Sequence, residues 1–497
     1  MRSPGSAATL LLSASRYLSS SGRVARSRPF TTAPGSASLP ETPAANIYDV
    51  VIVGGGPAGC ALAGILGSSA ALADARIALV DTGRLADARL WEPPADTYLS
   101  RTLQITSSNK RYLDNLGLWD QCFLGRVQPY NRAIVTDALG RGKLDLEGAA
   151  LESPTEGHTA FMIETKNLVG GLLRALSRNG HRVDIFERAR AVDIGVLRSE
   201  GLSAASEWPV VTLSTKQKLR ARLLVGADGA SSLVRKHAQI GTYSNKYGQY
   251  GLVATLCLEQ LNQTAFQRFL PSGPIALLPF PGGFANLVWS LDAGLVQVLK
   301  AVSEDAFTCL VNAAFRLSPP EMEYLYGLAR AGVPTGEIKA EAEWRLRIYA
   351  ANHTDAERWL PPTIAATSPK SRTSFPLLMR VVDRMVAERV ALVGDAGHVM
   401  HPLAGQGLNM GLEDVQCLAA TIEQAVLAGE DMGTLAVLSR YNKQRYARNL
   451  AMQGVVDKVW HVFGTSASPI AKTRSLAMSA LDSLPSIKQR LVRDMMS

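Results

Sequence analysis

The stretch that most constrains the fold is an apolar run that passes directly into three spaced glycines. Residues 50–53 are apolar and predict a buried parallel strand, and the small residues of 60–66 predict a helix. Between them lie Gly54, Gly56 and Gly59. In a strand–turn–helix unit the first glycine permits a tight turn, the second lets the backbone approach a pyrophosphate, and the third permits close packing of the helix. A GxGxxG motif alone also occurs in ordinary glycine-rich turns, so the residues around it decide its meaning.

The next strand supports a dinucleotide site. Residues 76–81 form a second apolar run that ends in Asp81, 22 residues after Gly59. A carboxylate at this position can accept hydrogen bonds from the ribose hydroxyls of an adenosine. Strand, glycine turn, helix and terminal acid together predict a dinucleotide-binding unit.

A second strand and turn occur at residues 223–235, where Asp228 and Gly229 follow an apolar run and precede a helix. The alternative is a simple strand–turn–helix in which Asp228 caps the helix. Three runs before it predict a small antiparallel crossover layer; they span 183–185, 209–213 and 219–224.

A third strand and turn occur late in the chain. Residues 390–393 predict a strand that leads into Asp395, and a glycine-rich loop then opens a helix over 410–427. Asp395, His398 and His401 could be mistaken for metal ligands. Pro402 follows at once and no further His or carboxylate cluster completes a ligand shell, so we expect no metal.

Together, GxGxxG, GADGxxSxVR and GDAxHxxHPxxGQGxNxG resemble the group A FAD-dependent aromatic hydroxylases, which have the p-hydroxybenzoate hydroxylase fold. The resemblance implies FAD as cofactor. It places the pyrophosphate at the first turn, the ribityl chain at the third turn and the isoalloxazine ring beside the loop that follows. The FAD-binding residues it implies are Gly54, Gly56, Ala58, Gly59, Asp81, Arg101, Asp228, Gly229, Asp395, Pro402, Gly405, Gly407, Leu408 and Asn409.

Within that family the chain most resembles the mitochondrial ubiquinone-biosynthesis hydroxylases, through residues 111–119, 273–279 and 375–377. This implies C5-type ring hydroxylation of a polyprenylated 4-hydroxybenzoate or phenol by O₂, through a flavin C4a-hydroperoxide. The expected electron donor is ferredoxin with its reductase, or NAD(P)H, and the expected partners are other ubiquinone-biosynthesis enzymes in a membrane-associated complex. Because the flavin carries the chemistry, no catalytic side chain is assigned. His398 and His401 are candidates by proximity alone, and a structural role is the alternative for both.

The expected fold class is α/β: an FAD-binding Rossmann-like domain interleaved with a mostly β substrate domain, plus C-terminal helices. Apolar runs at 273–281 and 284–289 suit the substrate sheet. The expected segments are a transit peptide (1–44), FAD-binding parts (45–125, 163–243 and 376–430), a substrate-sheet segment (126–162), a substrate domain with an insertion (244–375) and C-terminal helices (431–497).

The formal net charge of +9 is concentrated at the start of the chain. Residues 1–40 hold five arginines and no acid, and they are rich in serine, which is typical of a mitochondrial transit peptide. A secretory signal is the rival interpretation, but its apolar core would be longer. The rest of the chain holds 47 basic and 43 acidic residues, a net +4, which argues against nucleic-acid binding. We expect a mitochondrial protein, peripheral on the matrix face of the inner membrane.

Two C-terminal patterns and the cysteines complete the prediction. An apolar stripe over 452–463 has helical spacing and is expected to pack on the FAD domain. A short basic segment over 487–495 is either a membrane or partner contact or a docked tail. Five dispersed cysteines without a CxxC pair exclude a disulfide scaffold.

The sequence is also compatible with other function classes. A different flavin reaction on a lipid, such as epoxidation or flavin reduction, is one alternative. A flavin-bound structural member of a biosynthetic assembly is another, although intact motifs at all three turns argue against it. A plain NAD dehydrogenase leaves the second and third turns unexplained.

Overall fold

The computed structural model describes residues 46–140, 142–147, 158–178, 183–197, 207–353, 357–401, 405–465 and 468–488. These residues all belong to one of the chain's two compact units, Glu41–Ser497. The expected transit peptide, Pro402 and residues 489–497 lie outside the described part.

The glycine-rich turns are carried by one sheet. Its main strand order is β18-β19-β11-β1-β2-β8; in addition, β10 pairs with β11 and β9 pairs with β10. The strands are β1 (Ile47–Val53), β2 (Ile77–Val80), β8 (Val183–Phe186), β9 (Ala191–Leu197), β10 (Trp208–Leu213), β11 (Lys218–Gly226), β18 (Val386–Ala387) and β19 (Val390–Leu392). Strands β2, β1, β11 and β19 run parallel, so their carboxyl ends deliver all three turns to one edge.

The antiparallel layer predicted for three runs is correct for two of them. Strands β10 and β11 pair antiparallel, with β9 on the outside. The prediction is wrong for 183–185, because β8 pairs parallel with β2 at the edge of the main sheet. The apolar pattern of 183–185 does not show whether this strand pairs with a parallel or an antiparallel neighbour, since a short strand at a sheet edge is half buried in either case.

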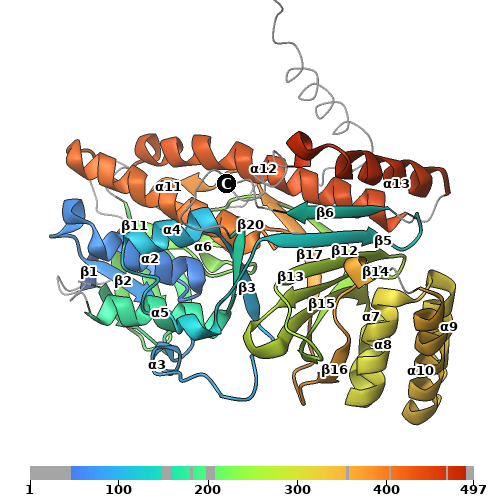
Figure 1. Ribbon diagram of the computed structural model, residues 1–497. Helices are drawn as coiled ribbons and strands as arrows, with labels where there is room; N and C mark the ends of the chain where they lie inside the picture. Colours follow the sequence, from blue (N-terminus) through green and yellow to red (C-terminus); the bar gives the residue numbers. More distant parts are fainter. Residues whose placement is uncertain are drawn as a thin grey trace, which may run out of the picture. The chain divides into compact units, whose positions relative to one another are not determined.

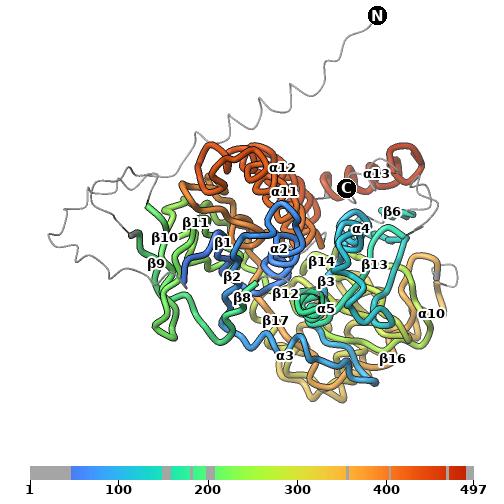
Figure 2. Tube along the Cα trace, turned by 90° about the vertical axis from the view of Figure 1, so that its left-hand side faces the viewer, coloured from blue at the N-terminus to red at the C-terminus, as the bar shows by residue number. Residues whose placement is uncertain are grey.

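Helices cover the faces of this sheet. Helix α2 (Pro57–Ser68) follows the first turn and packs against α5 (Thr165–Arg178) and α11 (Gly407–Leu427), as Figure 2 shows for the blue, green and orange segments. Two short helices, α3 (Leu85–Arg89) and α6 (Leu233–His237), follow β2 and β11. A small sheet of β3 (Thr102–Thr106), β4 (Gln128–Tyr130) and β7 (Ala160–Glu164), with α4 (Ser107–Asn115), lies beside α11.

The other described strands form a nine-stranded substrate sheet of order β20-β17-β12-β15-β14-β13-β5-β6, with β16 paired to β12. They are β5 (Arg132–Asp137), β6 (Lys143–Glu147), β12 (Thr242–Leu258), β13 (Thr264–Leu270), β14 (Gly273–Pro279), β15 (Phe284–Asp292), β16 (Ile364–Thr367), β17 (Thr373–Val382) and β20 (His398–Val399).

Four helices cover one face of the substrate sheet (Figure 1). They are α7 (Ala293–Ala301), α8 (Glu304–Arg316), α9 (Pro319–Arg330) and α10 (Thr335–Asn352). Alternate residues of β14, Ile275 and Leu277, are fully buried in the core against this layer. The insertion over 291–373 is therefore a helical layer that closes one side of the sheet, and the substrate domain is less purely β than expected.

The C-terminal region contains α12 (Leu435–Gly464) and α13 (Ser468–Asp482). The prediction that the 452–463 stripe packs on the FAD domain is only half right. Met452 and Val456 do pack against Met400 and Met410, but the stripe also faces the open side of the substrate sheet. An amphipathic period reveals an apolar face without saying which neighbour meets it. In the described part of the chain, no helix has the length and apolar character needed to cross a bilayer.

Candidate active site

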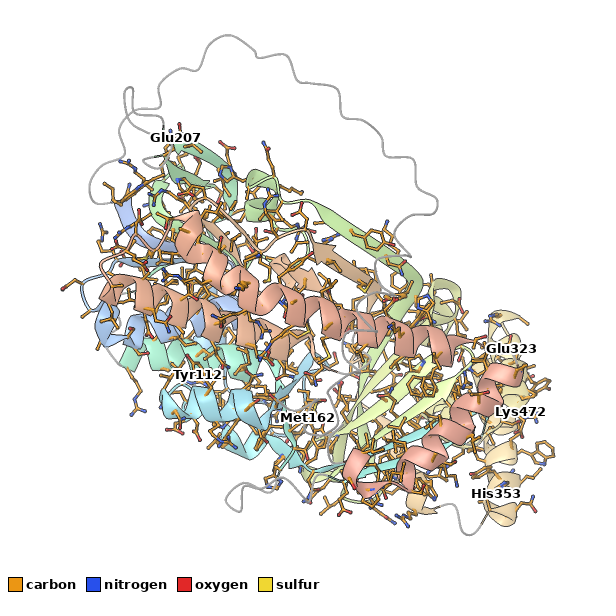
Figure 3. All side chains as sticks on the ribbon, turned by 90° about the horizontal axis from the view of Figure 1, so that it is seen from above. Tyr112, Met162, Glu207, Glu323, His353 and Lys472 are labelled. Carbon is orange, nitrogen blue, oxygen red and sulfur yellow. The ribbon has the colours of Figure 1, made fainter. Side chains whose placement is uncertain are left out.

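A single cavity of about 1940 Å³ joins the two sheets. One end reaches the first glycine turn at Gly56 and the third turn at Asp395. The other end extends over the substrate sheet and beneath α12 and α13. Met162 of β7, labelled in Figure 3, lies in the wall between these ends.

The first turn has the geometry that its three glycines predict. Gly54 has φ +113°, and a Cβ there would lie 2.2 Å from the carbonyl oxygen of Ala227. A Cβ on Gly59 would lie 1.8 Å from the carbonyl oxygen of Gly54, so the start of α2 can approach the turn only without a side chain. Gly56 has no atom within 4 Å of its Cβ position and faces the cavity with Ala58. The turn is therefore tight on the protein side and open on the cavity side.

Asp81 and Arg101 both lie close to this turn. The carboxylate of Asp81 accepts hydrogen bonds from Gly55 N at 2.7 Å and Gly83 N at 2.6 Å, so it holds the turn in shape. Arg101 is exposed and lines the cavity, and its backbone oxygen accepts a hydrogen bond from Thr165 N. Arg101 is thus a cation at the cavity wall, and the backbone uses part of the hydrogen-bonding capacity of the Asp81 carboxylate.

The second turn matches the capping alternative only in part, because Ser232, not Asp228, is the N-cap of α6 and accepts a hydrogen bond from Arg235 N. Asp228 Oδ2 accepts hydrogen bonds from Leu233 N at 2.6 Å and Val234 N at 3.3 Å. Its Oδ1 is buried and has no hydrogen-bond partner among the described residues, while Gly229 lines the cavity. Behind it, Arg235 donates hydrogen bonds to the carbonyl oxygens of Ala230 and Ala396 and so joins the second turn to the third.

At the third turn some residues line the cavity and others lie behind them and hold them in place. Asp395, Gly405, Gly407 and Leu408 line the cavity. Burial among the surrounding groups raises the pKa of Asp395, and His398 opposes part of that rise. The Asp395 carboxyl lies at the cavity wall, where its oxygens can meet a hydroxyl.

Asn409 lies behind this wall and is fully buried. Its Oδ1 accepts a hydrogen bond from Thr106 N at 2.9 Å, and its Nδ2 donates one to Gln104 O at 3.0 Å. Asn409 thus ties the start of α11 to β3 and fixes the position of the loop that lines the cavity.

A buried network of hydrogen bonds and ion pairs around Asp414 holds the third turn in place. Asp414 of α11 accepts hydrogen bonds from Gly394 N at 3.1 Å, His398 Nε2 at 2.5 Å, Arg445 Nε at 2.9 Å and Asn449 Nδ2 at 3.0 Å. Desolvation acts to raise the pKa of Asp414, but His398 and Arg445 outweigh it and leave the pKa below its usual value. His398 is therefore engaged in positioning the turn.

His401 has a different environment. It is 1% exposed, and neither ring nitrogen has a hydrogen-bond partner among the described residues. Its ring meets the Tyr247 ring edge-on at 5.1 Å. Burial lowers the pKa of His401 to about 4, so the imidazole is neutral at pH 7. Within the described residues there is no cluster of three His, Cys, Asp or Glu side chains that could hold a metal.

His401→Phe is expected to make the protein less sensitive to acid. Below its ordinary pKa of 6.5 an unfolded His401 takes up a proton, whereas the folded one does so only near pH 4. The unfolded state binds more protons in this window, so wild-type stability falls as pH drops, by on the order of 2 kcal/mol from this group. Urea unfolding at about pH 4.5 and about pH 7 measures the difference between wild type and variant.

The matched control is His461→Phe, at a position on α12 where the side chain is 57% exposed. It is expected to leave the pH dependence of unfolding unchanged. Equal acid sensitivity in His401→Phe and wild type would contradict a buried neutral imidazole at this position.

The floor of the cavity is the face of the substrate sheet that the helical layer leaves open. Ala276 and Leu278 of β14 and Val288 of β15 line it, and their strand neighbours point into the core on the other side. Register places Ala276 opposite Val288 and opposite Gln267 of β13. The roof consists of apolar residues of α12 and α13: Met452, Val455, Val456, Val459, Val462, Phe463, Pro469, Ile470, Ala477, Met478 and Leu481.

Several residues that shape the site have no signal in the sequence. Arg126 forms a buried double hydrogen bond with Glu164 and also binds the carbonyl oxygens of Pro94 and Thr97, which fixes the segment leading to Arg101. Arg445 is another, since nothing in its helix pattern marks it as buried. Arg235 could have been found, because it ends the GADGxxSxVR motif.

The residues present fit FAD. The open cradle at Gly56 and the start of α2 suit a pyrophosphate, and Arg101 supplies a cation nearby. Asp395 can accept hydrogen bonds from ribityl hydroxyls, and the start of α11 borders the place expected for the ring. When bound, FAD supplies redox chemistry and the activation of O₂.

Comparisons with known proteins support FAD as the cofactor. The FAD binding domain family model matches residues 47–268 and 340–456. The mitochondrial ubiquinone biosynthesis monooxygenase COQ6 of Saccharomyces cerevisiae is 34% identical over 460 residues, which cover 90% of this chain and 94% of the relative. The Homo sapiens COQ6 is 32% identical, with 90% of this chain and 92% of the relative covered.

Solved structures show the same fold at low identity. The p-nitrophenol 4-monooxygenase PnpA from Pseudomonas putida superposes with a TM-score of 0.63 at 17% identity, covering 90% of this chain and 98% of PnpA. Klebsiella pneumoniae HpxO, complexed with FAD and uric acid, gives a TM-score of 0.61 at 16% identity, covering 90% and 95%. The chain therefore belongs to the family of FAD-dependent monooxygenases that includes the COQ6 ubiquinone biosynthesis monooxygenases.

Proposed function

We propose that this flavin-dependent monooxygenase hydroxylates the aromatic ring of a polyprenylated 4-hydroxybenzoate or phenol in ubiquinone biosynthesis, with C5-type regiochemistry. The observation that carries the proposal is the continuity of the cavity, which runs from the FAD-binding turns to a long apolar space between the substrate sheet and α12 and α13. A ring can lie at the flavin end while an isoprenoid tail occupies the apolar end.

The chain's own contribution is binding, orientation and exclusion of water. Apolar residues on the floor and roof exclude water from the reacting ring, which protects an activated oxygen species from wasteful breakdown. The tail, held along Ala276 and Val288, fixes which ring carbon faces the flavin. His398 and Asp414 keep the third turn rigid beneath the cofactor, which makes His398 a positioning residue.

The site residues implied by the family resemblance are part of this proposal. Gly54, Gly56 and Gly59 would form the pyrophosphate turn, and Asp395 would hold the ribityl chain. We further propose ferredoxin with its reductase as electron donor, other ubiquinone-biosynthesis enzymes as partners, and a peripheral position on the matrix face of the mitochondrial inner membrane. The names of the COQ6 relatives, which place those proteins in mitochondria, support the compartment.

The test is a comparison of substrates that differ only in tail length. We expect kcat/KM for hydroxylation of 3-polyprenyl-4-hydroxybenzoates to rise as isoprene units are added, because each unit buries apolar surface in the cavity. Flavin content serves as the control for intact protein. Equal kcat/KM for tailed and tailless rings would contradict the assignment of the apolar space.

A further inference from the structure

Helices α12 and α13 form the roof of the cavity and also expose apolar side chains to solvent. On α12, residues 448, 451, 455, 458 and 462 share one helical face, and all five are exposed. Val455 and Val462 of this face are 57% and 41% exposed and also line the cavity. This face of α12 is therefore a rim, with solvent on one side and the apolar cavity on the other.

Helix α13 continues the rim. Its buried side holds Arg474, whose guanidinium pairs with Asp137 at the end of β5 and also donates to carbonyl oxygens at the end of α12. Ile470, one turn before Arg474 on the same side of the helix, lines the cavity and is 46% exposed, whereas Leu476 lies on the opposite side from Arg474 and is 73% exposed. Leu484 and Ile487, just beyond the helix, are also exposed, at 46% and 52%.

Basic residues outnumber acidic residues in the two helices. Together α12 and α13 contain seven Lys and Arg residues and two Asp residues. Arg448, Lys458 and Lys472 are exposed and form no ion pair with an acid in the described part of the chain. Figure 3 looks down onto α12 and α13 and labels Lys472 on α13. A helix pair with exposed leucine and isoleucine beside unpaired cations matches an anionic lipid surface.

We propose that this rim, made of Arg448, Val455, Lys458 and Val462 on α12 and of Ile470, Lys472, Leu476, Leu484 and Ile487 on and after α13, docks on an anionic phospholipid bilayer. Docked in this way, the apolar cavity opens toward the membrane, and a polyprenyl tail passes between bilayer and cavity without crossing water. The inference rests on the proposed function, because a bilayer is where a polyprenylated phenol resides. Lys488 does not take part, since its ammonium binds Asp145 O and Asp482.

The experiment is flotation of the flavin-loaded full chain with vesicles of phosphatidylcholine alone and of equimolar phosphatidylcholine and phosphatidylglycerol. Wild type is expected to float with the anionic vesicles. The double variant Leu476→Asp/Leu484→Asp changes two exposed positions that do not line the cavity, and should lower partitioning about tenfold or more. The triple variant Arg448→Gln/Lys458→Gln/Lys472→Gln should lose about fivefold per residue on anionic vesicles only.

The matched control is Leu261→Asp, at an 80% exposed leucine between β12 and β13, which should bind vesicles as wild type does. Flavin absorbance and turnover of a short-tailed, soluble phenol should be the same in all variants. Failure of wild type to float, wild-type binding by the Leu476/Leu484 variant, or a wild-type dimer that this variant dissociates would each overturn the docking surface. Vesicle binding without hydroxylation of any phenol would instead overturn the proposed function and leave the docking surface standing.

Discussion

Gly56→Leu is expected to yield a folded protein that carries no flavin. The Cβ position of Gly56 has no protein atom within 4 Å, and its φ of −73° suits any residue, so the apoprotein should lose only about 1 kcal/mol for a poorer helix cap. The leucine side chain would fill the open cradle where the FAD pyrophosphate is expected. Absorbance of the purified protein near the flavin bands, with urea unfolding of the flavin-free forms, measures both effects.

Gly59→Ala is the matched control from the same turn. Its Cβ would lie 1.8 Å from the carbonyl oxygen of Gly54, so this smaller change should destabilise the fold itself as well as remove flavin. The two variants therefore separate cofactor binding from packing. Normal flavin content in Gly56→Leu would show that the pyrophosphate lies elsewhere.

Ala276→Trp is expected to abolish hydroxylation of long-tailed substrates and leave flavin bound. Ala276 lies in the middle of the cavity floor between Val288 and Gln267, so an indole there occupies the path of the tail. Displacing a substrate ring by about an ångström costs roughly a hundredfold in rate, and we expect a loss of at least this size in kcat/KM. Steady-state assays with a long-tailed and a tailless substrate measure the loss.

The tailless substrate should lose much less than the long-tailed one. Ala340→Trp, at an exposed position on α10, is the control for the effect of adding an indole. Equal losses for both substrates, or wild-type activity on the long-tailed one, would contradict the placement of the tail along β14.

The elements that local sequence specifies were predicted well. An apolar run followed by glycines at fixed spacing requires a particular backbone, and β1, α2, β2, β19 and α11 appear where these patterns place them. The α/β fold class and the FAD cofactor, both implied by the family resemblance, are confirmed by the comparisons. The alternative that Asp228 caps the short helix was partly right, because its carboxylate accepts hydrogen bonds from Leu233 N and Val234 N although Ser232 is the N-cap.

Features that depend on contacts between distant segments were not predictable in this way. The pairing of Asp414 with Arg445 joins two helices, and either residue alone resembles an ordinary surface charge. The four-helix layer over 293–352 follows from burial against a sheet that the local pattern does not reveal. The 452–463 stripe was recognised as apolar, yet its neighbour across the cavity is set by the path of the whole chain.

The central claim is that one cavity brings flavin-activated oxygen to the ring of a tailed phenol. Its most direct test is a single turnover in which the flavin is reduced without air, mixed with a 3-polyprenyl-4-hydroxybenzoate, and then exposed to ¹⁸O₂. We predict a ring-hydroxylated product whose new hydroxyl carries the label, formed in an amount close to that of the flavin reoxidised. Flavin reoxidation that gives only hydrogen peroxide, or a product whose new oxygen comes from water, would contradict the account.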